Sequence, residues 1–219
     1  RPNLATMLCF LTTDAAISKD ALDKALRNAV DRSFNMIAVD NDTSTNDMVL
    51  IMANGTAQNP LIEYGTDRYE IFEKYLTDVC VYLAKWLVRD GEGATKFIEV
   101  RVRGAADYQD AKSAAFAIAC SDLVKTAMFG EDPNWGRIVA AIGYSDAFVD
   151  PDKIGVSIGP VRIVENGVSV GYREESAKEA LSGKDVSIVV DLNVGPAEAV
   201  VWTCDLSYDY VRINGSYRS

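Results

Sequence analysis

Apolar and polar residues follow one another along the first third of the chain in a pattern that predicts strands and helices in turn. The apolar run 6–13 (TMLCFLTT) has the length and content of a buried strand, and 48–54 (MVLIMAN) predicts another. Helical spacing of apolar residues predicts a helix over 18–34, with Ser18 as its N-cap. The segment 67–88 predicts a longer helix, and we interpret its stripe of large apolar side chains as core packing rather than a cofactor-binding face. That stripe comprises Phe72, Tyr75, Leu76, Val79, Leu83, Trp86 and Leu87.

The remaining two thirds continue the alternation. Segment 96–104 (KFIEVRVRG) alternates strictly and predicts a half-buried strand in antiparallel pairing, and 109–128 predicts an alanine-rich helix. Asn166-Gly167 is the preferred dipeptide of a type I′ hairpin turn. A short helix ending at Gly183 follows, and 185–215 contains enough β-branched and aromatic residues for three strands. The whole pattern predicts a mixed α/β protein of stacked layers, with a subdomain boundary near 145–155.

Composition narrows the classes of function. The 219 residues are 48% hydrophobic, enough for one large or two small cores, and no apolar run is long enough for a membrane helix. The net charge of -10 repels phosphate backbones and anionic lipids, so we expect neither nucleic acid nor a membrane as a partner. The first residues do not resemble a signal peptide, and the missing initiator Met leads us to expect a processed piece of a longer product.

Cysteine and histidine usage limits the chemistry further. Cys9, Cys80, Cys120 and Cys204 are widely spaced among apolar residues without a C-x-x-C motif, which favours buried free thiols in a reducing compartment over a zinc site. The chain has no histidine. Ser-His-Asp and Cys-His arrangements are therefore excluded, and proton transfer would use carboxylates, lysine, tyrosine, an α-amine or water.

Two polar segments each allow a structural and a functional interpretation. Segment 39–49 (VDNDTSTNDMV) fails as a calcium loop because positions six and twelve would be Thr45 and Ile51, and we favour a hydrogen-bonded turn over a substrate-facing loop. In 89–97 (RDGEGATKF), Gly91 could cap a helix, or the two glycines could hold Glu92 where it meets a cationic ligand. Spacing alone leaves both interpretations open.

The last two polar segments are simpler. In 129–138 (FGEDPNWGRI), Asp132 followed by Pro133 predicts the start of a helix, with Asp132 as its N-cap. Asn214 and Ser219 directly follow a predicted strand, so this terminus can dock back on the body of the protein.

Thr6 is a candidate nucleophile. A threonine hydroxyl needs an adjacent base, and without histidine the nearest base is its own α-amine, whose pKa is about 8. That amine exists only if the Ala5-Thr6 bond is cut, which attack of the Thr6 hydroxyl on the Ala5 carbonyl would achieve. The structural alternative is that Thr6 is an ordinary β-branched residue opening a strand.

Taken together, the segments RPNLATML..TTDA, VDNDTSTND, DGEGATK, FGEDPNWGRI and CDLSYDYVRING-SYRS resemble the ornithine acetyltransferase (glutamate N-acetyltransferase) family of arginine biosynthesis, in order and from end to end. The resemblance implies a precursor that cleaves itself before Thr6 into α and β chains, commonly assembled as α2β2. It implies that 1–5 is the end of the α chain, 6–150 the catalytic part with an N-terminal nucleophile, and 151–219 a smaller C-terminal α/β subdomain whose tail returns to the active site. The implied fold is a layered αββα sandwich.

The resemblance also implies a reaction and its residues. Thr6 would accept acetyl from N2-acetylornithine and pass it to glutamate, with Glu92, Asn214 and Ser219 contacting the substrate. It implies no metal and no resident cofactor, acetyl-CoA as a co-substrate in some members, and a cytoplasmic location. The family's oxyanion donors and a substrate-binding lysine lie in the α portion, so we expect this chain alone to be inactive. Two alternatives stay open: an amidohydrolase or aminopeptidase with the same kind of nucleophile, and a non-catalytic assembly subunit.

Overall fold

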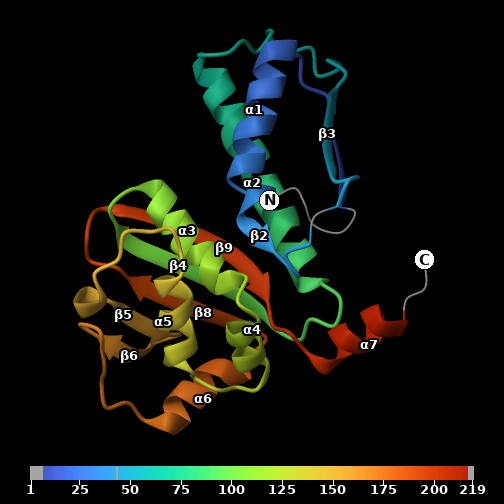
Figure 1. The fold of residues 1–219 in the computed structure, drawn as a ribbon. Coiled ribbons are helices and arrows are strands. Elements are labelled where there is room, and N and C mark those ends of the chain that lie inside the picture. Colours follow the sequence, from blue (N-terminus) through green and yellow to red (C-terminus); the bar gives the residue numbers. More distant parts are fainter. Residues whose placement is uncertain (1–6, 43, 217–219) are drawn as a thin grey trace. The chain divides into compact units, whose positions relative to one another are not determined.

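The computed structural model describes residues 7–42 and 44–216, in two compact units formed by 1–87 and 88–219 (Figure 1). Predicted site residues Ala5, Thr6 and Ser219 therefore lie outside the described residues. The boundary between residues 87 and 88 separates two units that each have most of their contacts within themselves. The predicted boundary between residues 150 and 151 separates a catalytic part from a C-terminal subdomain, and it stays a prediction. The mixed α/β class is confirmed.

The first unit is a two-stranded parallel sheet with two helices. Ser18 begins the first helix as predicted, because its hydroxyl accepts a hydrogen bond from the Ala21 amide at 3.3 Å. Ala21, Ala25 and Ala29 form the buried face of that helix. The elements are β1 (Leu8–Thr13), α1 (Lys19–Asp31), the 3-10 turn η1 (Phe34–Met36), β2 (Ile37–Ala38), β3 (Met48–Ala53) and α2 (Asp67–Arg89), the last of which ends two residues into the second unit.

The burial predicted for the first unit is partly wrong. In β1 and β3, which pair in parallel, alternate side chains are exposed, so neither is a fully buried strand. In α2, only Leu76 of the predicted core stripe is buried, while Tyr75 and Trp86 are 63% and 54% exposed. The buried face of α2 is instead Tyr69, Leu76, Cys80, Ala84 and Val88. Both strands and the helix thus have an apolar face that nothing in this chain's described residues covers.

The second unit is a mixed sheet packed against helices. Its strands β9 (Ala197–Cys204), β4 (Phe97–Ala105), β8 (Asp185–Asp191), β5 (Gly155–Ile158), β6 (Val161–Glu165) and β7 (Val168–Ser169) are neighbours in that order. The half-buried alternation predicted for 96–104 is confirmed, although β4 pairs antiparallel with β9 and parallel with β8. The β6–β7 turn is the predicted type I′ hairpin, since Asn166 and Gly167 both have positive φ.

Helices of this unit pack on the sheet through small residues. Ala111, Ala114, Ala115 and Ile118 of α3 are fully buried, which lets the helix approach β4 and β9 closely (Figure 1). The helix predicted over 109–128 is two helices, because the Ser121 hydroxyl accepts the Val124 amide and starts a new one. The helices are α3 (Tyr108–Ala119), α4 (Asp122–Phe129), α5 (Trp135–Gly143), the 3-10 turn η2 (Pro151–Lys153), α6 (Glu174–Ser182, ending at Gly183 as predicted) and α7 (Tyr208–Ser216).

Two local predictions in the second unit are wrong for identifiable reasons. Asn134, not Asp132, is the N-cap of α5, because the Asn134 side chain accepts the Arg137 amide at 3.3 Å. The segment expected to form a third strand within 185–215 is helix α7 instead. Just before this helix, the Ser207 hydroxyl accepts a hydrogen bond from the Asp209 amide at 3.2 Å. Asn214 therefore lies in a helix rather than after a strand.

A charged cluster holds three strands of the second unit together. Asp191 on β8 accepts hydrogen bonds from Arg103 on β4 and from Arg162 on β6, the latter at 2.5 Å. Burial alone would raise the pKa of Asp191, but the two arginines outweigh it and hold that pKa below its ordinary value. The cluster is a structural ion pair that ties the sheet across its strands.

Candidate functional site

Glu92 and Asn214, which both have predicted substrate contacts, are in direct contact. The Asn214 side-chain Nδ2 donates a hydrogen bond to Glu92 Oε2 at 2.8 Å, although the residues are 122 positions apart. The same Nδ2 donates to the Tyr210 carbonyl at 3.1 Å, which fixes the amide on α7. Both side chains are exposed. Glu92 Oε1 and Asn214 Oδ1 accept no hydrogen bond from the described residues, so two acceptors and one negative charge face solvent together.

Asp205 clamps the loop that carries Glu92. Its Oδ1 accepts the backbone amides of Thr95 and Lys96, each at 2.8 Å, and its Oδ2 accepts the Thr95 hydroxyl. Asp205 is only 3% exposed, and its own amide donates to the Lys96 carbonyl at 3.2 Å. The segment 92–97 is therefore fixed to the end of β9, immediately before the chain turns into α7.

Gly93 allows α7 to approach this loop. A Cβ atom at Gly93 would lie 2.5 Å from the Tyr210 amide nitrogen and 2.9 Å from the Asp209 carbonyl carbon, and its φ of +68° is one that side-chain-bearing residues rarely adopt. The Ser207 hydroxyl closes the junction by donating to the Gly93 carbonyl at 2.5 Å. Gly93 thus holds the Glu92 loop against α7, and the Gly91 amide donates to the Val88 carbonyl at 3.2 Å just after the end of α2. Each glycine has the local role that one of the two interpretations gives it, and the contact of Glu92 with a cationic ligand stays a prediction.

The segment 129–138 also contacts the loop that carries Glu92. Buried Lys96 forms an ion pair with Glu131 at 3.0 Å and donates to the Leu181 carbonyl at 2.5 Å. Glu131 belongs to FGEDPNWGRI and has a φ of +54°. Sequence reasoning missed Lys96, Glu131, Asp205 and Ser207. The only signal was that each lies inside one of the segments that carried the family resemblance.

The surroundings of Thr6 can be described from Met7 onward. The Met7 amide donates to Asp47 Oδ1 at 2.8 Å, and the Met7 carbonyl accepts the Met48 amide at 2.8 Å. Asp47 Oδ2 is buried and accepts nothing from the described residues. Segment 39–49 thus does more than turn the chain, because its last acidic residue holds the residue that follows Thr6.

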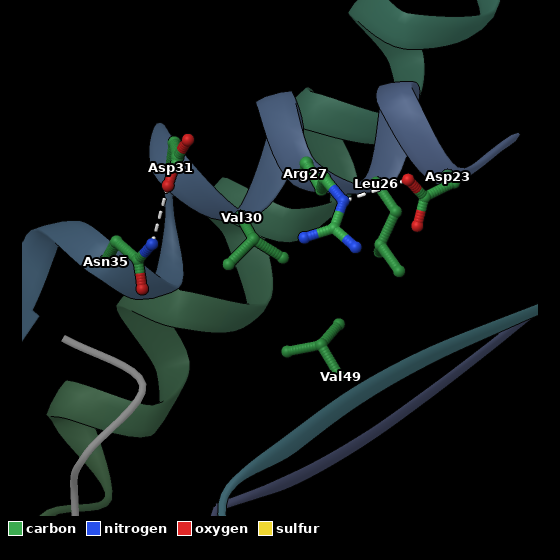
Figure 2. Close-up of a pocket in the computed structure, with 7 residues that line it drawn as sticks. All are labelled: Asp23, Leu26, Arg27, Val30, Asp31, Asn35 and Val49. Carbon is green, nitrogen blue, oxygen red and sulfur yellow. Dashed lines mark hydrogen bonds and ion pairs between the residues drawn. The ribbon is translucent and has the colours of Figure 1, made fainter. Parts of the chain in front are cut away.

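A groove lies between α1 and β3 in the first unit (Figure 2). Leu26 and Val30 on the helix lie opposite Val49 on the strand, and the Arg27–Asp23 ion pair of 2.8 Å lies at its side. No predicted site residue lines this groove. Within residues 7–42 and 44–216, no three histidine, cysteine, aspartate or glutamate side chains are grouped to hold a metal ion, and no helix is long and apolar enough to cross a membrane.

The chain matches one family model and several known proteins along its whole length. The model is that of the ArgJ family and covers residues 1–219. The chain is 55% identical to a protein of Symbiobacterium thermophilum and 52% identical to one of Caldanaerobacter subterraneus subsp. tengcongensis, and both matches cover 100% of this chain. Each of these two relatives is named arginine biosynthesis bifunctional protein ArgJ. The chain spans 54% and 55% of those relatives.

A solved structure agrees. The crystal structure of the protein with the same name from Bacillus halodurans superposes with a TM-score of 0.93 at 48% identity, covering 97% of this chain and 100% of the solved one. The resemblance seen in the sequence is thereby confirmed, and the chain belongs to the ArgJ family.

Proposed function

We propose that this chain is the β part of an acetyltransferase that moves acetyl from N2-acetylornithine to glutamate through an acetyl-Thr6 intermediate. The observation that carries the proposal is the contact between Glu92 and Asn214. An exposed amide oxygen beside an exposed carboxylate suits the ammonium group of an amino acid, because a charge-assisted hydrogen bond is stronger than a neutral one. The names of the relatives support a role in arginine biosynthesis.

Cleavage would come first in this mechanism. The Thr6 hydroxyl attacks the Ala5 carbonyl carbon, and the Ala5–Thr6 C–N bond breaks as its nitrogen takes up a proton, which frees the Thr6 α-amine and leaves Ala5 as an ester on the Thr6 oxygen. Water then hydrolyses that ester and releases the Thr6 hydroxyl and the Ala5 carboxylate. The lengths of the relatives support such a cut. The curated proteins are nearly twice as long as this chain, whereas the Bacillus halodurans chain is covered in full by it.

Acetyl transfer then proceeds in two steps. The α-amine takes the Thr6 hydroxyl proton as the oxygen attacks the acetyl carbonyl, and the proton passes to the departing amine of ornithine. Glutamate's α-amine next attacks the acetyl ester and restores the hydroxyl. Without histidine, the α-amine is the base that this mechanism requires. We propose that the α part of the same precursor supplies oxyanion donors and a lysine, that the two parts assemble as α2β2 in the cytoplasm, and that acetyl-CoA is an alternative donor.

The test is an assay of the complete two-part protein with N2-acetylornithine, with and without glutamate. The proposal expects ornithine release to depend on glutamate after one turnover, with N-acetylglutamate as the product. Continuous release of acetate without glutamate would instead indicate the amidohydrolase alternative. A protein in which Ala5–Thr6 stays intact and neither product forms would indicate the non-catalytic alternative.

A further inference from the structure

Asp47 has a buried carboxylate oxygen without a partner, close to the start of β1. Its Oδ1 accepts the Met7 amide at 2.8 Å, whereas its Oδ2 is buried and has no hydrogen-bond partner among the described residues. No lysine or arginine among those residues forms an ion pair with Asp47. Because a buried carboxylate oxygen without a donor or a counter-ion is destabilising, its position calls for a partner or a function.

Backbone pairing fixes Asp47 beside Met7. The Met7 carbonyl accepts the Met48 amide at 2.8 Å, and the parallel register continues from there with Leu8 beside Met48. Asp47 therefore lies beside Met7, one position before the paired strands begin. Met7 is only 7% exposed, so the amide that Asp47 Oδ1 binds is largely shielded from water, which strengthens the contact.

Covalent geometry ties the Thr6 α-nitrogen to this carboxylate. Three bonds join that nitrogen to the Met7 nitrogen, so the two atoms are within about 4 Å of each other in any backbone conformation. The Met7 nitrogen is itself 2.8 Å from Asp47 Oδ1. The α-amine that the proposed mechanism uses as its base is thus a donor that the chain itself brings within reach of Asp47.

We propose that Asp47 is a positioning residue for the nucleophile: its Oδ2 accepts a hydrogen bond from the Thr6 α-amine once the chain begins at Thr6. The inference rests on the proposed function, whose mechanism uses that amine. When the amine takes the Thr6 hydroxyl proton it becomes an ammonium group, and the carboxylate stabilises this positive charge. Asp47 stays ionised throughout and orients the base, as the aspartate of a Ser-His-Asp triad orients its histidine.

The experiment compares Asp47→Asn with wild type in the complete two-part protein. Asp47→Asn keeps an oxygen that can accept the Met7 amide and removes the negative charge. Asp42→Asn is the matched control, because Asp42 is an exposed aspartate of the same segment 39–49. If a protein does not cleave itself, the same chain is produced from Thr6 onward behind an initiator Met, which cellular aminopeptidase removes before threonine.

Two readouts are measured. The first is the pKa of the Thr6 α-amine, obtained from its rate of carbamylation by cyanate between about pH 6 and 10 and read by peptide mass spectrometry. The second is the rate of Thr6 acetylation in the absence of glutamate, at several concentrations of N2-acetylornithine. The first readout does not require acetyl transfer, so it tests the contact even where the proposed function fails.

We expect the pKa of the Thr6 α-amine to be about one unit higher in wild type and Asp42→Asn than in Asp47→Asn, because the carboxylate favours the ammonium form. Acetylation of Asp47→Asn should be at least about tenfold slower, with an unchanged half-saturating concentration of N2-acetylornithine. A merely structural role for Asp47 would lower the folded fraction and leave the pKa of the amine unchanged.

The proposal is overturned if the Thr6 α-amine has the same pKa in Asp47→Asn and in wild type, or if Asp47→Asn is acetylated at the wild-type rate. An unchanged pKa with acetylation lost by more than about a thousandfold would assign the hydroxyl proton to Asp47 itself. An amine pKa that is higher in wild type than in Asp47→Asn, in a protein that acquires no acetyl group, would support the contact and count against the proposed function only.

Discussion

Glu92 on the loop after α2 and Asn214 on α7 are joined by a hydrogen bond of 2.8 Å. The contact brings together two segments from opposite ends of the second unit, and on each side chain it leaves an acceptor that no other described residue contacts. This geometry suits recognition of an amino-acid ammonium group.

Removing the charge of Glu92 tests its role in binding. Glu92→Gln keeps an oxygen that can accept from Asn214 but loses the carboxylate, so we expect KM for N2-acetylornithine to rise about tenfold or more, with a smaller change in kcat. Steady-state kinetics of the two-part protein measures this. Glu175→Gln, an exposed carboxylate of α6, is the control and should change neither constant. Equal KM values for Glu92→Gln and wild type would remove Glu92 from the site.

Adding a methyl group at Gly93 tests the close approach of α7. Gly93→Ala must push the Tyr210 amide away, so we expect weaker substrate binding together with a loss of stability of more than about 2 kcal/mol. Gly65→Ala is the matched control, because Gly65 has a similar φ of +80° but no atom within 4 Å of the added Cβ. It should cost only about 1 kcal/mol and leave KM unchanged. Thermal unfolding measures the loss of stability that backbone strain causes in both variants, and a rise in KM only in Gly93→Ala would report the displacement of α7.

Asp205 is predicted to fix the Glu92 loop. Asp205→Ala removes the acceptor of two amides and one hydroxyl from a buried position, so unfolding should become easier by about 3 kcal/mol. Asp205→Asn retains one oxygen for the two amides and should recover part of that loss. Denaturant unfolding measures both variants, and equal stability of Asp205→Ala and wild type would contradict the clamp.

Predictions of local structure were right where residues close together in the sequence determine that structure, and they were wrong where distant residues determine it. Ser18, Gly183 and the Asn166-Gly167 turn were predictable because neighbouring residues decide them. The apolar run of β1 and β3 suits a strand buried on both faces, but side chains on one face are exposed among the described residues, as at Phe10 and Met52. A local pattern does not show which faces of a strand the rest of the fold covers.

The candidate site could not be predicted from local sequence patterns, because residues far apart in the sequence form it. Helix α7 and the contact of Glu92 with Asn214 depend on Ser207, Gly93 and Asp205, which come together only in the folded chain. Residue spacing left the role of Glu92 open and placed Asn214 only at a terminus that can dock back on the protein. The family resemblance alone implied a substrate contact for both residues.

The Asp191 cluster predicts how stability depends on pH. The folded-state pKa of Asp191 lies below its ordinary value of 3.8, so its contribution to stability is present above about pH 4 and is lost as the pH falls through the folded-state pKa. Asp191→Asn should therefore lower stability at pH 7 by about 2 kcal/mol and flatten the decline on acidification. Unfolding free energies at several pH values between about 7 and 3 measure the difference. Parallel curves for variant and wild type would contradict this role.

The proposed mechanism requires Thr6 to carry the acetyl group between the two substrates. Intact-protein and peptide mass spectrometry of the two-part protein, mixed with N2-acetylornithine in the absence of glutamate, tests it most directly. We expect a chain that begins at Thr6 and carries one acetyl group on the Thr6 hydroxyl, and we expect that acetyl group to disappear when glutamate is added. Acetyl transfer to glutamate by a Thr6→Ala variant at the wild-type rate would contradict it.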